Sequence, residues 1–368
     1  MDTTIEILKG AERVRRRPAV IFGSDGAEGV ANAFDLMLNA LSGDCVAGFS
    51  KQLIITHSWN AYISLEEFGS GIYLADGVWQ ELFCQMYAGS AYAFPQPPCR
   101  SIFEAPGPNA LPLGDNMELY AVQCASANMD VRVRRDGFER TLHFEKGENI
   151  GGLTETPSDA PSGTYLRFQP DDTVFTKTTL DPAFFTGKAK MLALLNPGLQ
   201  VICRFDLCDG IKEQTFCFPN GIADYLLHEY NCRDVFNAVL EAEGRERYDR
   251  PSYSAKLAVG LRFHKHSHSS LCCHNQRELT YGGTHLDALT DCIYKELEWL
   301  LPQDFTKAEM MAHLHLVVLS SSDITCWQNG SRRSIENVLI RDMAQDILKD
   351  AFPAYVHKNR QQLRELFK

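Results

Sequence analysis

The stretch from Tyr281 to Leu286 reads YGGTHL and stands at the start of a long predicted helix. It is the segment of the chain that says most about the fold. A second distinctive segment lies near the beginning, where Ile5–Gly10 reads IEILKG and Arg15–Pro18 reads RRRP. Most of the residues whose spacing points to chemistry lie between these two segments.

The size and composition predict a globular chain of two domains. The chain has 368 residues, of which 45% are hydrophobic and 23% are charged, and each domain can bury its own core. The longest apolar runs, such as Leu314–Leu319, are too short to cross a bilayer. Met1–Gly10 has neither the apolar run of a signal peptide nor the arginines of a transit sequence. We therefore expect a cytoplasmic protein with no membrane partner.

The net charge of −11 argues against broad binding to a phosphate backbone, because an acidic surface repels nucleic acid. Two local basic segments are exceptions: the arginines from Arg13 to Arg17, and the tail Lys358–Lys368. We interpret them as a solvated helix face and a solubilising tail. The 12 cysteines are scattered without CxxC pairs, which predicts reduced, mostly buried thiols.

The first domain is predicted to end at residue 218 and to be α+β, with helices on one face of a sheet. Helices are expected at Glu28–Asp44, Asp76–Tyr87 and Pro182–Asn196, from apolar spacing and from the Asn-Pro-Gly stop after Leu195. Strands are expected at Gln52–His57, Ala61–Glu66, Met129–Val133, Arg140–Phe144, Thr164–Phe168, Val201–Leu207 and Gln214–Phe218. A long loop, rich in Pro, Gly and Ala, is expected at Ala93–Gly114.

The second domain is predicted to cover residues 219–368. It begins with a helix that ends at Tyr230. The remaining elements are strands at Lys256–His264, Ser270–His274 and His313–Leu319, a long helix after His285, and a helix at Ile335–Phe352. No internal repeat interrupts this order.

Asp35 and Asn39 are four residues apart on a predicted helix, so both project from one face. A carboxylate can take a proton from water, and an amide oxygen one turn further on can ligate Mg²⁺. Alone the pair is a weak signal, because polar residues at this spacing usually mark a solvated stripe. The flanking residues make it stronger, since the run Phe34–Leu41 reads FDLMLNAL.

These motifs together resemble the ATPase and transducer region of the B subunits of DNA gyrase and topoisomerase IV. Phe34–Leu41 resembles that family's F-E-x-x-x-N-A-x helix, and Glu67–Ile72 (EFGSGI) resembles its D-D-G-R-G-I run. YGGTHL and the N-terminal Arg-Pro segment occur together in that family. The resemblance implies a GHKL (Bergerat-type) ATPase sandwich, followed by a transducer domain similar to ribosomal S5 domain 2, and implies ATP and Mg²⁺ as ligands.

The resemblance assigns roles to residues on the predicted helix and turn. It implies that Asp35 is the general base and that Asn39 binds both the nucleotide and the metal. Asp is one methylene shorter than the family's Glu, so its carboxylate would fall roughly 1.5 Å short of the attacking water, a misplacement that can cost about 10²-fold in rate. The family's second acid falls at Ser42–Gly43, with Asp44 as a shifted substitute.

The turn after the second strand would hold the base of the nucleotide. Glu67 stands where an Asp accepts the adenine amino proton, and Gly69, Gly71 and Ile72 keep their places. The family's Arg is Ser70 here. The larger acid would block the adenine or change the preferred base. A simple glycine turn between two segments explains the same residues equally well.

The phosphate-binding segment matches least. The family closes over the triphosphate with a glycine-rich segment whose backbone N–H groups bind anions. Leu113–Leu119 has one glycine and two acids, Asp115 and Glu118, and Gly89-Ser90-Ala91 replaces a Gly-Gly-Lys. The like charge of these acids argues against tight triphosphate binding.

Three further positions match the family in part. Thr164, in Ser162–Phe168, would help to hold adenine through water, and Arg135 would line the outer edge of the pocket. Gln328 matches the first residue of a Q-T-K loop, but Gly330 replaces its Lys, and Arg332 and Arg333 lie close by. Each position also has an ordinary explanation: a strand Thr, an Arg beside a hairpin, and an Asn-Gly turn.

A separate group of possible metal ligands comprises His264, His266 and His268, followed by Cys272, Cys273 and His274. Alternation would place the three histidines on one strand face, where they could hold Zn²⁺. The segment is expected in a hairpin between two strands, where polar side chains simply meet water. The simpler interpretation is therefore no zinc.

Two functional hypotheses follow. The first is an ATP-driven clamp that dimerises through its N-terminal arm and works with an A-type topoisomerase subunit or DNA. The second is a pseudo-ATPase that serves as a dimerisation or regulatory module. The family's later DNA-cleavage domain is absent from the sequence, so we expect no DNA cleavage by this chain alone.

Overall fold

The computed structural model describes residues 10–58, 62–74, 78–84, 117–207, 210–246, 252–328 and 333–368. The chain divides into two units, Met1–Cys217 and Phe218–Lys368. None of the described helices has both the length and the apolar character that crossing a membrane would require.

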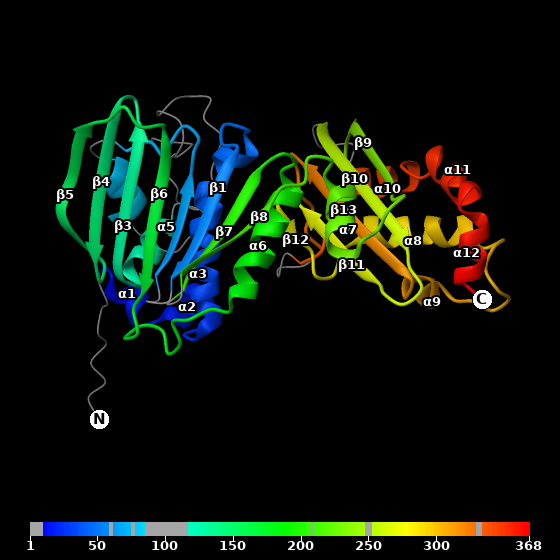
Figure 1. Cartoon of the computed structure of the whole chain (residues 1–368), viewed down its shortest axis with the longest axis horizontal. Coiled ribbons are helices and arrows are strands. Elements are labelled where there is room, and N and C mark those ends of the chain that lie inside the picture. Colours follow the sequence, from blue (N-terminus) through cyan, green and yellow to red (C-terminus); the bar gives the residue numbers. More distant parts are fainter. Residues whose placement is uncertain are drawn as a thin grey trace. The chain divides into compact units, whose positions relative to one another are not determined.

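The first unit contains a mixed eight-stranded sheet in the order β5-β4-β3-β6-β2-β1-β7-β8 (Figure 1). All neighbours are antiparallel except β1 and β7. The strands are β1 (Gln52–Ser58), β2 (Ile63–Glu67), β3 (Ser126–Arg135), β4 (Phe138–Glu145), β5 (Glu148–Pro157), β6 (Gly163–Pro170), β7 (Gln200–Leu207) and β8 (Gly210–Phe216). The helices are α1 (Glu12–Arg15), α2 (Pro18–Phe22), α3 (Ala27–Val46), α4 (Val78–Cys84), α5 (Met117–Cys124) and α6 (Pro182–Leu195).

The core of this unit lies between the sheet and the helices. Alternation along β3 buries Met129, Val131 and Val133, while Arg132 lies over the Tyr165 ring, 4.7 Å from its centre, on the other face. On α3, Val30, Phe34, Met37 and Leu41 are buried at helical spacing. Helix α6 begins at Pro182, where the Asp181 side chain accepts the Ala183 N–H at 2.8 Å.

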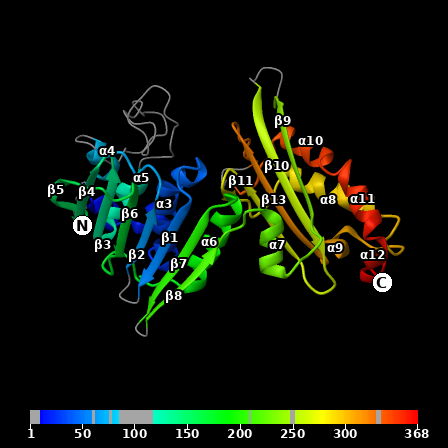
Figure 2. The ribbon, with the colours of Figure 1, turned by 45° about the horizontal axis from the view of Figure 1, so that its top comes forward.

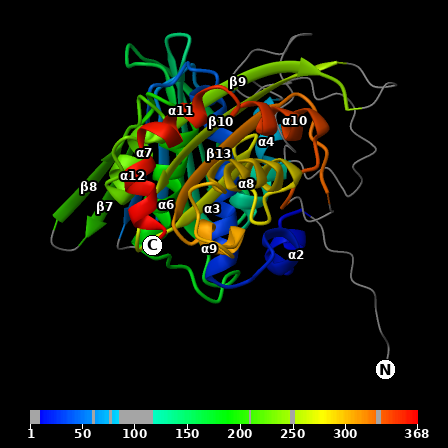
Figure 3. The ribbon, with the colours of Figure 1, turned by 90° about the vertical axis from the view of Figure 1, so that its right-hand side faces the viewer.

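The second unit contains a five-stranded sheet in the order β12-β11-β13-β10-β9. Helix α7 packs on one face, directly over Gly260 of β10. The approach is close, because a Cβ at Gly260 would lie 2.2 Å from the Ile222 side chain. Helix α10 packs on the other face, as Figures 2 and 3 show. The elements are α7 (Ile222–Tyr230), β9 (Phe236–Gly244), β10 (Tyr253–Phe263), β11 (Ser269–His274), β12 (Arg277–Glu278), α8 (Thr284–Leu297), α9 (Lys307–Met311), β13 (Leu314–Ser322), α10 (Val338–Asp346), α11 (Ala351–Lys358) and α12 (Arg360–Leu366).

The predicted fold class is confirmed, with helices covering a mixed sheet, but several predicted details were wrong. The strands β5 and β9 were missed because each is an edge strand with few buried residues. The helix predicted at Ile335–Phe352 begins later, at Val338, because Ile335 instead forms β-bridges with Gly283 and Trp327. It also ends at Asp346, before α11 begins at Ala351.

The two basic segments are also more structured than expected. Arg15 forms an ion pair of 2.5 Å with Asp171, which is 2% exposed. The tail is not a solubilising appendage, because it forms α12 and buries Leu363 and Phe367 in the core of the second unit. No disulfide joins the described cysteines, and most of them are buried.

Candidate functional site

Helix α3 carries the two residues that the sequence places at a catalytic centre. Asp35 and Asn39 lie on the side of the helix opposite its buried residues, and Asn39 is exposed. Asp44, near the end of the same helix, is fully buried. At 1.5 Å rise per residue, Asp35 lies about 14 Å along the helix from Asp44. Nine residues correspond to about two and a half helical turns, so the two carboxylates project from opposite sides of α3.

Asp35 is already paired. Its Oδ2 accepts a hydrogen bond of 2.7 Å from Lys188 Nζ on α6, and both side chains are about one-third exposed, 33% and 35%. Burial raises the pKa of Asp35, and the Lys188 charge partly opposes that rise. The Lys188 ammonium also lies 5.3 Å from the centre of the Phe184 ring. A cation thus occupies one side of the carboxylate that the sequence predicts to be a base.

Glu67, at the end of β2, has no exposed surface. Its Oε2 accepts the Gly69 N–H at 2.5 Å, while its Oε1 is buried with no hydrogen-bond partner. Burial raises the pKa of Glu67 to about 7. Leaving a buried polar atom unpaired costs roughly 1–3 kcal/mol, so such an atom is a candidate contact for a ligand.

Asp44 approaches the same turn from α3. Its carboxylate accepts the Ser70 N–H at 2.5 Å and the Ser70 hydroxyl at 2.8 and 2.9 Å. A Cβ at Gly69 would lie 2.3 Å from Asp44 Oδ2 and 2.8 Å from Glu67 Oε2. Glycine is therefore required at position 69, because two carboxylates face it.

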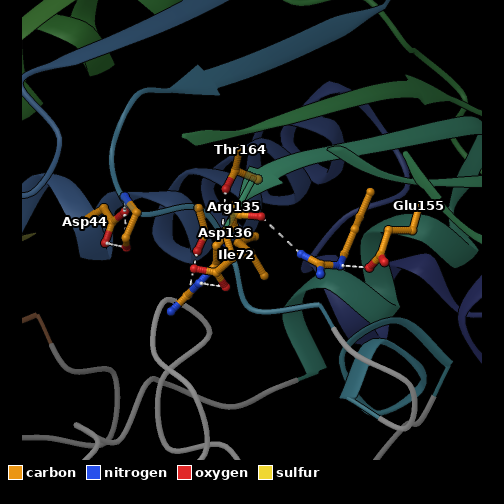
Figure 4. A network of polar contacts seen from close by, with 9 residues as sticks. Asp44, Ile72, Arg135, Asp136, Glu155 and Thr164 are labelled. Atoms are coloured by element: carbon orange, nitrogen blue, oxygen red, sulfur yellow. Dashed lines mark hydrogen bonds and ion pairs between the residues drawn. The ribbon is translucent and has the colours of Figure 1, made fainter. Parts of the chain in front are cut away.

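Thr164 fixes the other side of the turn (Figure 4). Its hydroxyl accepts the Ile72 N–H at 2.9 Å, and both residues are buried. Gly71 has φ +78, and a Cβ there would lie 2.8 Å from the Arg134 carbonyl oxygen. The turn from Glu67 to Ile72 is thus held by β6 and β3, which lie far from it in sequence.

Arg135 closes the edge of this group. Its guanidinium donates a hydrogen bond of 3.0 Å to the Gly71 carbonyl and lies 5.4 Å from the centre of the Tyr73 ring. It also contacts Asp136 at 3.5 Å. The predicted residues Glu67, Gly69, Gly71, Ile72, Arg135 and Thr164 therefore form one cluster, with Asp44 and Ser70 added to it.

Part of the predicted phosphate-binding segment lies outside the described residues, as do Gly89-Ser90-Ala91, Gly330 and Arg332. Gln328 lies in the second unit, where its N–H donates to the Ser334 carbonyl at 3.1 Å. The structure gives Gln328 a backbone role in a turn and no described contact with a site residue.

The YGGTHL segment is structural in this fold. A Cβ at Gly283, where φ is +144, would lie 2.1 Å from the Ile335 carbonyl oxygen, and Thr284 N–H donates to that oxygen at 3.1 Å. His285 is buried and its Nε2 lies 3.2 Å from Cys272 Sγ. The two glycines allow the Ile335 segment to lie directly against the start of α8.

The predicted histidine cluster does not form a strand face. His264, His266 and His268 lie in the loop between β10 and β11, and these strands are not a hairpin because β13 lies between them. His274 is buried and bonds the hydroxyls of Ser320 and Thr325 at 2.9 and 3.0 Å. Among the described residues, no group of three His, Cys, Asp or Glu side chains is arranged to hold a metal ion.

Comparisons with known proteins show what the chain is similar to. No protein-family model matches the chain. The B subunit of DNA topoisomerase 4 from Caulobacter vibrioides is 28% identical over 60% of this chain and 32% of that protein. The DNA gyrase B subunit of Thermotoga maritima is 24% identical over 77% of the chain and 44% of its own length. The DNA gyrase B subunit of Mycoplasma pneumoniae is 22% identical over 100% of this chain and 58% of its own length.

Solved structures share the fold. The 43K ATPase domain of Thermus thermophilus gyrase B, in complex with an aminocoumarin, has a TM-score of 0.68 and 19% identity, with 98% of this chain and 93% of that chain covered. The B subunit of the DNA gyrase from Myxococcus xanthus has a TM-score of 0.72 and 18% identity, covering 96% and 99%.

The resemblance predicted from the motifs is confirmed: the homologues of this chain are B subunits of DNA gyrase and topoisomerase IV. The chain spans about a third to somewhat more than half the length of these curated relatives.

Sequence reasoning missed one residue of the site and undervalued two others. Lys188 is 153 positions from Asp35 and carries no local signal that would connect the two. Ser70 was treated only as a lost Arg, and Asp44 only as a shifted substitute. Their mutual hydrogen bonds explain both, because a Ser at position 70 suits a carboxylate at position 44.

Proposed function

We propose that this chain is a gyrase-B-type nucleotide-binding module that binds ATP with Mg²⁺ weakly and hydrolyses it slowly or not at all. The observation that carries this proposal is the 2.7 Å hydrogen bond from Lys188 Nζ to Asp35 Oδ2. A general base must offer a lone pair to the proton of water. The Lys188 ammonium occupies a lone pair of that carboxylate and partly opposes the rise in its pKa that burial causes, and Asp is shorter than the Glu of the family.

The residues that would hold the base of the nucleotide suit their ligand better than the residues that would hold its phosphates. Glu67 Oε1 is a buried atom in need of a partner, and Gly69 and Gly71 themselves carry no side chains. Asn39 exposes an amide that could ligate Mg²⁺. When bound, the metal would neutralise phosphate charge.

The role that agrees with these features is a dimerisation or regulatory module, as the pseudo-ATPase hypothesis states. The resemblance implies three partners for such a module: a second copy bound through the N-terminal arm, an A-type topoisomerase subunit, or DNA. We place this module in the cytoplasm. The net charge of −11 favours the protein partners over DNA.

Steady-state hydrolysis of ATP tests the proposal. We expect slow turnover by the wild-type chain, a change of less than about twofold in Asp35→Asn, and a severalfold increase in Lys188→Ala, because the second substitution frees the carboxylate. Lys190→Ala is the matched control, since Lys190 lies on the same helix and faces Phe216 instead.

The double variant Asp35→Asn/Lys188→Ala should lose the increase, which separates release of Asp35 from a general effect on α6. Rapid wild-type turnover that Asp35→Asn abolishes would show Asp35 to be a working base and would refute the pseudo-ATPase role.

The ATP-driven clamp remains the second candidate, because Asp35 and Asn39 do share the outward side of α3. Calorimetric titration with a non-hydrolysable ATP analogue and Mg²⁺ discriminates the two. Micromolar affinity that disappears in Asn39→Ala would favour the clamp, whereas affinity in the millimolar range would favour the weak-binding module.

A further inference from the structure

Two buried carboxyl groups converge on one glycine in the first unit. Asp44 on α3 and Glu67 on β2 have no exposed surface. A single atom placed at the Cβ position of Gly69 would lie 2.3 Å from an Asp44 oxygen and 2.8 Å from a Glu67 oxygen. Two carboxylates this close, both removed from water, resist simultaneous ionisation.

The hydrogen bonds decide which of the two groups carries the proton. Ser70 directs its N–H and its hydroxyl at Asp44, and these donors stabilise negative charge there. Glu67 receives the Gly69 N–H on Oε2, and the hydroxyl of Thr164, its neighbour across the β2–β6 pair, also favours the charged form of Glu67 but is outweighed by burial. No Lys, Arg or His among the described side chains forms an ion pair with Glu67, and its immediate neighbours are Asp44 and Cys45 from α3 and Thr164 from β6. The proton therefore resides on Glu67.

The position of that proton follows from the remaining contacts. Because Oε2 already accepts a hydrogen bond, the neutral group carries its hydrogen on Oε1. This is the atom that is buried with no partner. The turn thus presents an O–H donor where a charged carboxylate would present an acceptor.

We propose that Glu67 selects the base of the nucleotide, and that its neutral carboxyl donates a hydrogen bond to the 6-oxo group of a purine such as hypoxanthine or guanine in preference to the 6-amino group of adenine. This inference rests on the proposed function, because it assumes that the turn faces the base. It reverses the hydrogen-bond polarity that the resemblance implies, and it names Asp44 as a charge that reinforces the effect of burial in keeping Glu67 neutral.

The selection should depend on pH with a definite sign. Burial, reinforced by the Asp44 charge and opposed by Thr164 and Gly69, raises the pKa of Glu67 to about 7. The neighbouring Cys45 stays a neutral thiol, since burial raises its pKa to about 12. Below pH 7 Glu67 is a donor and favours an oxo group. Above pH 7 it is an acceptor and favours an amino group.

Calorimetric titration of the full chain with ATP and with ITP, in the presence of Mg²⁺, tests this inference. The two nucleotides differ only in the edge of the base that includes the 6-position. A mismatched buried hydrogen bond weakens binding, so ITP should bind about tenfold more tightly than ATP at pH 6. The ratio should fall severalfold, or reverse, at pH 8.5.

Three substitutions sharpen the test. Glu67→Gln keeps an acceptor for the Gly69 N–H and a permanent donor, so it should prefer ITP at both pH values. Asp44→Asn removes the adjacent charge and should shift the preference toward ATP at pH 7. Glu66→Gln is the control, because Glu66 is the next residue on the strand but contacts Arg132 at 3.9 Å and is 25% exposed. It should leave the ratio unchanged.

The possible outcomes are distinct. Tighter binding of ATP at both pH values, unaffected by Glu67→Gln, overturns the inference and leaves the proposed function standing. Absence of binding by either nucleotide overturns the proposed function and the inference with it. If Asp44→Asn unfolds, infrared spectroscopy of the wild-type chain at pH 6 takes its place. A neutral Glu67 should give a carboxyl C=O stretch that is lost in Glu67→Gln. If this band is absent from the wild-type spectrum, the neutral Glu67 is refuted.

Discussion

Glu66 and Glu67 are adjacent in sequence and differ completely in environment. The alternation of β2 turns Glu66 toward Arg132 and leaves Glu67 fully buried. The buried carboxyl has a pKa of about 7, above its ordinary value of 4.5. Because the folded state holds the proton more tightly than the unfolded state, Glu67 contributes stability below pH 4.5, and this contribution is lost as pH rises through 7.

The substitution Glu67→Gln should remove that dependence. The free energy of unfolding of Glu67→Gln, relative to the wild-type chain, should increase by about 2 kcal/mol between pH 5 and pH 8. Urea unfolding at several pH values, followed by fluorescence, measures the difference. Glu66→Gln provides the baseline, and an equal pH profile for the two variants would contradict a buried neutral Glu67.

At the scale of elements, the C-terminal helix α12 completes the core of the second unit. Phe367 directly follows α12 and is 3% exposed. Its ring contacts those of Phe263 on β10 and of Phe305, with centres 5.6 and 5.5 Å apart. A segment rich in basic residues therefore covers apolar side chains of the core, and its long charged side chains remain in water.

Phe367→Ala should destabilise the second unit by roughly 3–5 kcal/mol, the usual cost of deleting a buried aromatic side chain. Thermal unfolding followed by circular dichroism would detect the change. Gln362→Ala, an exposed position of the same helix, should have little effect. A melting temperature unchanged by Phe367→Ala would mean that the tail does not pack in solution.

At the scale of the whole molecule, the two units bury titratable groups that make their stability depend on pH in opposite directions. The second unit buries His274 and His285, and burial lowers the pKa of each to about 4. Because the unfolded state binds the proton more tightly, these histidines contribute stability above pH 6.5, and the contribution is lost as pH falls toward 4. The stability contributed by Glu67 in the first unit changes with pH in the opposite direction.

Raising the pH from 5 to 8 should therefore weaken the first unit and strengthen the second. Hydrogen exchange measured by mass spectrometry, corrected for intrinsic rates, reports the free energy of opening for each unit separately. His285→Leu should reduce the acid sensitivity of the second unit by up to about 3 kcal/mol. His357→Gln, at an exposed position, should leave it unchanged. Parallel pH responses in the two units would contradict the assignment.

Local pattern predicted those elements whose residues are buried on one side. Helix α3 and strands β1, β3 and β6 were predicted with only small shifts of their ends, because apolar residues recur at the helical or the strand period. Edge strands such as β5 bury few side chains, so their apolar residues do not recur at the strand period. The helix expected from Ile335 failed because tertiary pairing with Gly283 overrides the local preference of that segment.

The sequence by itself determined the class of fold and the candidate residues, because glycine positions and apolar periods are local properties of the chain. The tertiary structure alone decided what those residues can do. Lys188 reaches Asp35, and Asp44 meets the turn beside Glu67, only after α3, α6 and β2 have packed. Charge and protonation depend on such long-range neighbours, since burial and a nearby charge act through space and not along the chain.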